Sequence, residues 1–232
     1  MPKLVSRQRT SRVSLVDVAY EAIAESIFDR RIEPGARLRI DALAAELDMS
    51  ITPIREALAR SSAVGLTRLD ANRGHTVTPI LDAAAFHQLF AARRMIESGA
   101  VRSGERTPAA WAARVPAEQV RALRSHVTRM SRIGRGTRYA DYSRFSRLDH
   151  ELHLQLIGMG GNPFLITAFE SLHFHLHMSR LYAGAGVVDF EDAQAEHIAI
   201  VEALESNDGP AVWRACQGHM AQAERRLLPL LR

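Results

Sequence analysis

Residues 33–80 read EPGARLRIDALAAELDMSITPIREALARSSAVGLTRLDANRGHTVTPI, and turn signals divide this segment into short elements. Pro34-Gly35 ends a helix that the preceding apolar spacing predicts over about residues 14–31. ALAAEL, opened by Asp41, forms a second helix, and IREALARSSAV a third, which begins near Ser50 or Thr52. LTRLD and HTVTPI predict two short strands around a hairpin-type turn. Three helices followed by two strands are typical of a winged helix-turn-helix domain, here over residues 14–78.

Residues 82–232 show helical periodicity almost throughout. Proline and glycine breaks divide them into six predicted helices, at about 82–105, 116–133, 139–159, 162–183, 190–206 and 209–230. We expect Asp82 to cap the first of these helices. The predicted fold is therefore mainly α, with the N-terminal winged helix-turn-helix followed by an all-α antiparallel helical bundle.

Composition and charge narrow the class of protein. The chain has 232 residues, of which 47% are hydrophobic and 24% charged, an ordinary globular mixture. No apolar run is long enough for a membrane span, and no hydrophobic segment follows the first residues, so we expect neither a span nor a signal peptide. The single cysteine fits a reducing cytoplasm. Residues 1–13 form a basic arm with no acid, which indicates an anionic partner such as nucleic acid or, alternatively, a solvated tail.

Four motifs in the first domain follow one another in a recognisable order: PG..L, LA..L, S-x-TP-I-R-E-A-L and RG. Together they resemble the DNA-binding domain of the GntR family of bacterial transcription regulators. The family usually has arginine between the serine and threonine of the third motif, where this chain has Ile51. Because arginine there would read guanine or hold a phosphate, the change implies a different operator or weaker binding.

The same segment carries the candidate DNA contacts. Ser50 and Thr52, at a helix N-terminus, can donate to phosphate or base edges, and Arg55 can reach the DNA backbone. Arg73 and Gly74 form the wing, which would enter the adjacent minor groove or touch phosphate. The alternative is that the two hydroxyl residues only cap the helix and the arginine pairs with a neighbouring acid.

Titratable residues occupy the apolar faces of three predicted helices. On a helical wheel Asp149 and His153 lie one turn apart within one apolar stripe, and His197 and His219 are centred on two others. A buried imidazole or carboxylate without a partner is costly. Three imidazoles and one carboxylate suit a divalent transition metal, with zinc as the first choice and nickel or manganese as alternatives. A hydrogen-bonded network is the competing interpretation.

The remaining isolated histidines are interpreted as surface or edge residues: His75, His87, His126 and His150.

LDHELH, EHIAIVEAL and a final histidine resemble the C-terminal effector-binding domain, FCD, of the FadR branch of the same family. Its metal-binding members carry Asp-x-x-x-His, a later Glu-His and a last His, which match Asp149, His153, His197 and His219. With the winged domain, this resemblance covers nearly the whole chain. It implies an antiparallel bundle of six or seven helices and a dimer.

Arg93 and Glu97 lie near the centre of the apolar stripe on the first helix of the bundle. A buried guanidinium suits a carboxylate ligand, although an internal pair between the two is the alternative. They match the family's R-x-x-(I/L)-E motif, whose arginine is commonly linked to the effector's carboxylate. We therefore expect a small organic acid to bridge Arg93 and the metal. His173 and His177, which would share a helix face, are further candidates, as is Asn162, which also fits a helix cap.

Three functions compete at this point. The first is a ligand-responsive transcription regulator that binds a palindromic double-stranded operator as a homodimer, one recognition helix per half-site. The second is a metal-dependent hydrolase or lyase with an accessory DNA-binding domain, although neither HExxH nor GxSxG occurs. The third is a metal-sensing regulator. We favour the first: a cytoplasmic regulator that is not an enzyme.

Overall fold

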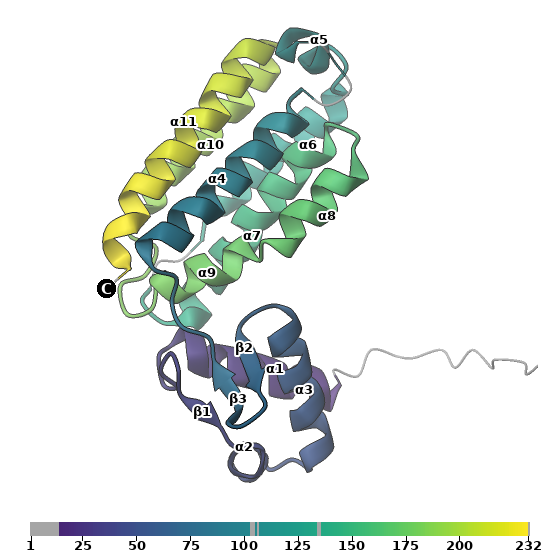
Figure 1. The fold of residues 1–232 in the computed structure, drawn as a ribbon. Coiled ribbons are helices and arrows are strands. Elements are labelled where there is room, and N and C mark those ends of the chain that lie inside the picture. The colour runs from purple at the N-terminus through teal and green to yellow at the C-terminus, as the bar shows by residue number, and fades with distance from the viewer. Residues whose placement is uncertain (1–13, 103–104, 106, 134–135, 232) are drawn as a thin grey trace, which may run out of the picture. The chain divides into compact units, whose positions relative to one another are not determined.

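A computed structural model of the chain describes residues 14–102, 105, 107–133 and 136–231. The described residues divide into two compact units, one of residues 14–27 and 32–78 and one of residues 28–31 and 79–231 (Figure 1). The predicted basic arm, residues 1–13, lies outside the described residues. Among these residues every helix is too short or too polar to cross a lipid bilayer.

The first unit is a winged helix-turn-helix, as predicted. Its described elements are α1 (Leu15–Phe28), β1 (Arg37–Leu38), α2 (Ile40–Glu46), α3 (Ile51–Ala63), β2 (Thr67–Asp70) and β3 (Gly74–Val77). The strands form an antiparallel sheet in the order β1-β3-β2. Ile23 of α1 and Ile54 and Leu58 of α3 are at most 1% exposed and belong to its hydrophobic core.

Strand β1 is an addition to the predicted two-stranded wing. It contains only two residues, Arg37 and Leu38, which pair with Thr76 and His75 of β3. So short a segment has no alternation of apolar and polar residues from which a strand could be inferred. Its pairing is decided by β3, which lies about 40 residues later in the chain and closes the sheet on that side.

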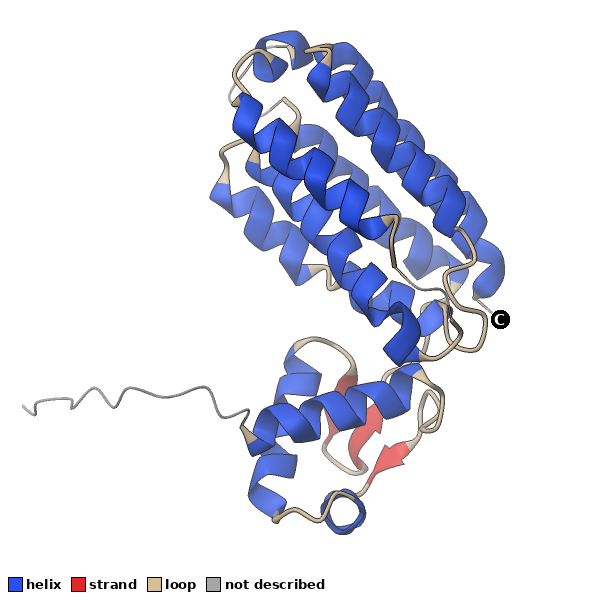
Figure 2. Ribbon diagram, turned by 180° about the vertical axis from the view of Figure 1, so that it is seen from behind, coloured by secondary structure: helices blue, strands red, loops and turns tan. Residues whose placement is uncertain are grey.

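The second unit is built from helices in its described part (Figure 2). They are α4 (Ala83–Ala100), α5 (Pro108–Ala112), α6 (Ala117–Met130), α7 (Tyr139–Gly158), α8 (Pro163–Ser171), α9 (Phe174–Leu181), α10 (Phe190–Glu205) and α11 (Gly209–Leu227), with a 3₁₀ turn at Leu228–Leu230. Asp82 caps α4 as expected, since its carboxylate accepts from the amide of Ala85 at 2.8 Å. The predicted all-α bundle is therefore confirmed.

Two helices differ from the expected pattern. The helix predicted over 162–183 is broken into α8 and α9, because His173 adopts a left-handed conformation with φ 45°. That conformation is unfavourable for a residue other than glycine, and no local signal announces it. Helix α5 is an addition, since no helix is predicted between residues 105 and 116, although proline after the capping Thr107 is a common way to begin a helix.

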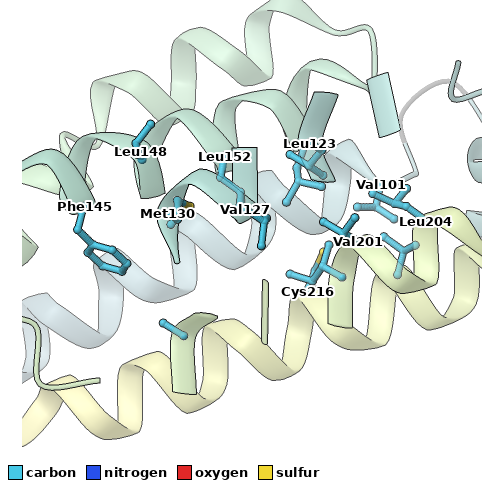
Figure 3. Packing of buried hydrophobic residues seen from close by; sticks show 14 of the residues in the cluster. Val101, Leu123, Val127, Met130, Phe145, Leu148, Leu152, Val201, Leu204 and Cys216 are labelled. Carbon is cyan, nitrogen blue, oxygen red and sulfur yellow. The ribbon is translucent and has the colours of Figure 1, made fainter. Parts of the chain in front are cut away.

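The main core of the second unit lies between α6, α7, α10 and α11 (Figure 3). Leu123, Val127, Leu152 and Val201 are at most 1% exposed, and Cys216 of α11 packs among them. Each such aliphatic side chain stabilises the fold by about 1.5–3 kcal/mol relative to exposure. The polar residues described next come from α4, α7, α10 and α11, and this core fixes three of these helices, while α4 packs through Phe86 and Phe90 in a second cluster.

Candidate metal centre and adjoining cavity

Three buried histidines converge from three helices. His153 of α7 and His197 of α10 are 0% exposed, and His219 of α11 is 4% exposed. Each offers one ring nitrogen to a group whose members all lie within 4.8 Å of one another. The ring centroids are separated by 4.6 to 5.5 Å. Helical periodicity placed each residue on an apolar face, and the packing of the three helices brings those faces together.

Asp149 adjoins this group. Its Oδ1 lies 3.4 Å from Nε2 of His197 and 3.9 Å from Nε2 of His153. Its side chain is 20% exposed, whereas the histidines are almost completely enclosed. The structure thus brings together all four residues that the sequence singled out as metal ligands.

Two of the imidazoles are held by carboxylates. Nδ1 of His153 lies 2.8 Å from Oε2 of Glu97, and Nδ1 of His219 lies 2.8 Å from Oε2 of Glu196. An ionised carboxylate can only accept, so both Nδ1 atoms carry the proton and donate. Each ring is then left with a free lone pair on Nε2, the atom through which it could bind a metal.

The carboxylates are ionised despite their burial. Burial alone would raise the pKa of Glu97, but Arg93 and His153 outweigh it and bring the pKa to about 2. Burial likewise opposes ionisation of Glu196, whose pKa is lowered to about 2 by hydrogen bonds from Arg226 and His219. Both groups therefore remain hydrogen-bond acceptors at neutral pH.

His197 differs from the other two histidines. Within the described residues, neither of its ring nitrogens has a hydrogen-bond partner, although both are buried. Burial, and then the neighbouring rings of His219 and His153, lower its pKa well below the usual value, so the ring is neutral. Nε2 of His153 is buried and unpartnered as well. A divalent ion would satisfy these nitrogens, and neutral imidazoles beside a carboxylate fit its chemistry.

A small cavity lies beside the histidines. Its lining is shared between the candidate ligands and side chains of α4, α7, α9, α10 and α11: Arg93, Phe145, Ser146, Asp149, Phe174, His175, Met178, Tyr182, Asp189, Ala193, His219, Ala223 and Leu227. Three lining residues have a buried polar atom without a hydrogen-bond partner among the described residues, namely Nη2 of Arg93, Oγ of Ser146 and Nδ1 of His175. The cavity therefore combines apolar walls with polar side chains that include both a guanidinium, on Arg93, and two carboxylates, on Asp149 and Asp189.

Arg93 has two environments at once. Its Nε donates to Oε1 of Glu97 at 2.5 Å, which confirms the internal pair that the sequence offered as an alternative. Its guanidinium carbon lies 3.9 Å from the centroid of the Phe174 ring, and Nη2 remains unpartnered in the described structure. The pair with Glu97 therefore leaves part of the guanidinium for a ligand.

The candidate DNA contacts lie on α3 and on the turn between β2 and β3. Ser50 is the N-cap of α3, but its hydroxyl makes no capping hydrogen bond, so it does not act as a side-chain cap. Thr52 and Arg55 are exposed on the same helix. Arg73 is exposed at the turn, where Gly74 has a φ of 72°. These side chains lie on the surface of the first unit.

Two family models match the chain. The model for bacterial regulatory proteins of the gntR family matches residues 15–77, and the FCD domain model matches residues 88–222, more than half of the chain. The chain belongs to the GntR family and carries an FCD domain.

Curated relatives of this GntR regulator have the same kind of function. The probable D-xylose utilization operon transcriptional repressor of Paenarthrobacter nicotinovorans is 25% identical over 215 residues, covering 92% of this chain and 89% of the relative. The Nta operon transcriptional regulator of Aminobacter aminovorans is 28% identical over 147 residues, covering 63% of this chain and 64% of that regulator. The families and these relatives are transcription regulators, so the chain is a DNA-binding regulator and not a hydrolase or lyase.

Solved structures of other regulators share the fold. E. coli McbR/YncC has a TM-score of 0.67 at 20% identity and covers 94% of this chain and 99% of its own. Lar, described as controlling the expression of the Listeria monocytogenes agr system, has a TM-score of 0.66 at 20% identity, with 95% and 99% coverage. Both matches extend over the winged domain and the FCD domain.

The other predicted effector residues lie elsewhere in the FCD domain. Asn162 caps α8 by accepting from the amide of Phe164 at 3.0 Å, and His173 is the left-handed residue that precedes α9. His177 lines a separate cavity with Phe86 and Arg180. The break at residue 173 explains the difference, because the prediction assumed one continuous helix with both histidines on one face. His175, which a continuous helix would place on the opposite face, lines the cavity beside the candidate metal centre.

Sequence reasoning also missed several partners. Glu196 immediately precedes His197 but contacts His219 on the neighbouring helix, which only the packing of α10 on α11 reveals. Arg226 is a charged residue on the otherwise apolar face of α11, and this position could have indicated that a buried carboxylate lies nearby. That carboxylate is Glu196. The interpretation of His126 as a surface residue is wrong. It is 1% exposed, and its Nε2 lies 2.7 Å from the carbonyl oxygen of Leu148.

Proposed function

We propose that this GntR regulator belongs to the FadR branch, holds a divalent metal in its FCD domain and responds to a small organic acid. The observation that carries the proposal is the environment of His197, a buried imidazole whose two nitrogens form no hydrogen bond among the described residues. Such a group is costly unless something binds it. The domains would run from 14 to 78 and from 82 to 232, which the family matches at 15–77 and 88–222 support.

The proposed ligands are Asp149, His153, His197 and His219. Three neutral imidazoles and one carboxylate favour zinc, and nickel and manganese are the alternatives. When bound, the ion would supply Lewis-acid coordination positions for an oxygen of the organic acid. The fixed Nδ1 protons of His153 and His219 orient both rings toward the ion in advance.

The proposed acid binds in the adjoining cavity. Its carboxylate would pair with the free part of the Arg93 guanidinium, which is desolvated and already oriented by Glu97. Ser146 and His175 would supply further hydrogen bonds, because both line the cavity with a buried unpartnered atom. We propose these two in place of His173 and His177, and we assign Asn162 to capping of α8.

Operator binding would use a homodimer with one α3 helix in each half-site of a palindrome. Thr52 and Arg55 of α3 and Arg73 of the wing are the proposed contacts, with Ser50 and Gly74 placing backbone amides near phosphate. The acid would change operator affinity by favouring one arrangement of the dimer, and a coupling of about 1–3 kcal/mol is sufficient.

Elemental analysis of the purified protein, followed by a thermal-shift screen of small carboxylic acids, tests this proposal. We expect about one zinc, nickel or manganese ion per chain and at least one acid that raises the melting temperature. The effect of the acid should be lost in Arg93→Met and kept in Arg94→Met, since Arg94 is already paired with Glu224 of α11. Protein without metal would contradict the proposed metal site. An acid that stabilises Arg93→Met as much as wild type would contradict the proposed contact with Arg93.

The partial exposure of Asp149 favours a second candidate, a regulator for which the metal itself is the signal. A 20% exposed ligand gives an ion a route for exchange, which a sensor needs. Operator affinity is then measured with and without a chelator, in the absence of any organic acid. A large loss with chelator would favour the metal sensor, and unchanged affinity would leave the organic acid as the signal.

A further inference from the structure

Two chains of hydrogen bonds run from an arginine through a glutamate to a histidine of the candidate metal centre. We propose that they fix the protonated nitrogen of His153 and His219, so that Glu97, Glu196 and Arg226 are positioning residues for metal binding. This inference rests on the proposed metal site and adds the residues that would decide its affinity.

The first chain connects α4 with α7. Arg93 Nε donates to Oε1 of Glu97 at 2.5 Å, and Oε2 of the same carboxylate accepts from Nδ1 of His153 at 2.8 Å. All three residues are at most 3% exposed. Both carboxylate oxygens are therefore engaged in a dry environment, where each hydrogen bond is stronger than in water.

The second chain connects α11 with α10 and returns to α11. Arg226 donates through Nη1 and Nη2 to the two oxygens of Glu196 at 2.7 and 2.9 Å. Oε2 of Glu196 accepts from Nδ1 of His219 at 2.8 Å. Arg226 and His219 lie two turns apart on one helix, so both reach the same glutamate from the same face. This paired geometry is the strong form of an arginine–carboxylate contact.

The two chains determine which ring nitrogen is free. Because each carboxylate only accepts, Nδ1 of both histidines holds the proton and Nε2 keeps its lone pair. Each carboxylate is also bound by an arginine, Glu97 by Arg93 and Glu196 by Arg226, so each remains a hydrogen-bond acceptor for its histidine. The rings of His153 and His219 lie 17° from parallel with centroids 5.2 Å apart, and His197 lies against both.

His197 has no such chain in the described structure, since both its nitrogens are unpartnered. Oδ1 of Asp149 lies 3.4 Å from its Nε2, and the candidate metal centre joins two histidines with a hydrogen-bonded Nδ1 to one without. Outer partners of metal-binding histidines typically change metal affinity by about 10- to 100-fold when removed. The structure therefore assigns a measurable share of metal affinity to residues that would never touch the metal.

The first test needs no substitution. In zinc-free wild-type protein labelled with ¹⁵N at histidine, long-range ¹H–¹⁵N spectra report which nitrogen of each ring carries the proton. We expect Nδ1-protonated rings for both His153 and His219. Either ring in the Nε2-protonated form would overturn the inference, whether or not the protein binds zinc.

The second test is Glu196→Ala, chosen because the Glu196 side chain is 22% exposed, whereas that of Glu97 is 4% exposed. We expect a zinc dissociation constant, measured by chelator competition, that rises about 10- to 100-fold. His219 should become a mixture of tautomers while His153 keeps its Nδ1 proton, which distinguishes the local effect from general damage. Glu202→Ala, an exposed glutamate on the same helix, is the matched control and should match wild type.

Unchanged zinc affinity and an unchanged His219 tautomer in Glu196→Ala would refute the positioning role. Wild-type protein that binds no divalent metal would overturn the proposed function, and this inference with it. Wild-type protein that binds zinc with His219 protonated at Nε2 would overturn the inference alone.

Discussion

His197 shows how one residue can reduce the stability of a protein and yet be useful to it. Its ring is fully enclosed, its nitrogens form no hydrogen bond in the described structure, and burial keeps it neutral. The enclosed imidazole lowers the free energy of unfolding of the metal-free protein, because it exchanges hydrogen bonds to water for none. The proposed metal would reverse that effect.

His197→Phe should therefore change stability with opposite signs in two conditions. With chelator, we expect the variant to be at least as stable as wild type, since a similar-sized apolar ring replaces an unsatisfied polar one. At a free zinc concentration 1,000 times the dissociation constant, wild type should gain about 4 kcal/mol and the variant much less. Urea unfolding at fixed protein concentration measures both. A variant that keeps the full gain from zinc would exclude His197 as a ligand.

The four candidate ligands could be predicted from the sequence because a polar residue on an apolar helical face is visible from periodicity alone. Their partners could not. The contact of Glu97 with His153 depends on how α4 packs against α7, and no local pattern records that packing. The pairing of Arg93 with Glu97 was foreseeable because both lie on one helix, one turn apart.

At the scale of single elements, α3 carries an exposed arginine near its start and another near its end. Arg55 is exposed and forms no ion pair within the described residues. Arg60 pairs with Asp17 at 2.9 Å and lies over the ring of Tyr20. The two thus serve as test and control on one helix.

We expect Arg55→Ala to weaken binding to a duplex selected in vitro and to reduce the slope of log affinity against log salt by about 0.9, the value for one lost phosphate contact. Arg60→Ala should leave the slope unchanged. Fluorescence anisotropy at several salt concentrations measures both. An unaltered slope in Arg55→Ala would show that its guanidinium does not contact phosphate.

Helix α11 contains two glycines with opposite surroundings. A Cβ on Gly209 would meet the carbonyl oxygen of Pro108 at 1.9 Å, so α5 lies directly against the start of α11. A Cβ on Gly218 would meet nothing within 4 Å. We expect Gly209→Ala to destabilise the fold by about 1–3 kcal/mol or more, and Gly218→Ala to stabilise it by about 0.5–1 kcal/mol. Thermal and urea unfolding would show the contrast. Equal effects would mean that α5 moves aside at little cost.

The elements that escaped prediction share one cause. β1 exists because β3 lies beside it, and the break between α8 and α9 exists because His173 is forced into a left-handed conformation. Both are decided by tertiary packing, which overrides local preference. The helices with glycine or proline at their ends were predicted to within a few residues, since those residues act locally.

At the scale of the whole molecule, buried ionisable groups link stability to pH. Burial, with Arg180 second, lowers the pKa of His177 to about 4, and burial lowers that of His175 to about 3. In the unfolded chain both histidines take up a proton near pH 6.5. The unfolded state therefore binds more protons than the folded state below that pH, and stability falls as pH decreases.

We expect the free energy of unfolding, measured with chelator present, to decrease from about pH 6.5 toward pH 4. Protonation of Glu97 and Glu196, whose folded pKa values lie at about 2, should add a further loss below about pH 4.5. His177→Phe should flatten the first part of this decrease and leave the second. A variant with the same pH profile as wild type would show that His177 remains protonatable in the folded protein.

The chain contains one thiol, on Cys216, and the fold encloses it at 3% exposure, three residues before His219 on α11. Burial also raises the pKa of this thiol, so little thiolate forms in the closed bundle. A thiol reagent can therefore react only when the helices separate, and its labelling rate records how often they do so. The labelling rate of Cys216 therefore measures how often the helical bundle opens, and the proposed metal and organic acid should both lower that rate.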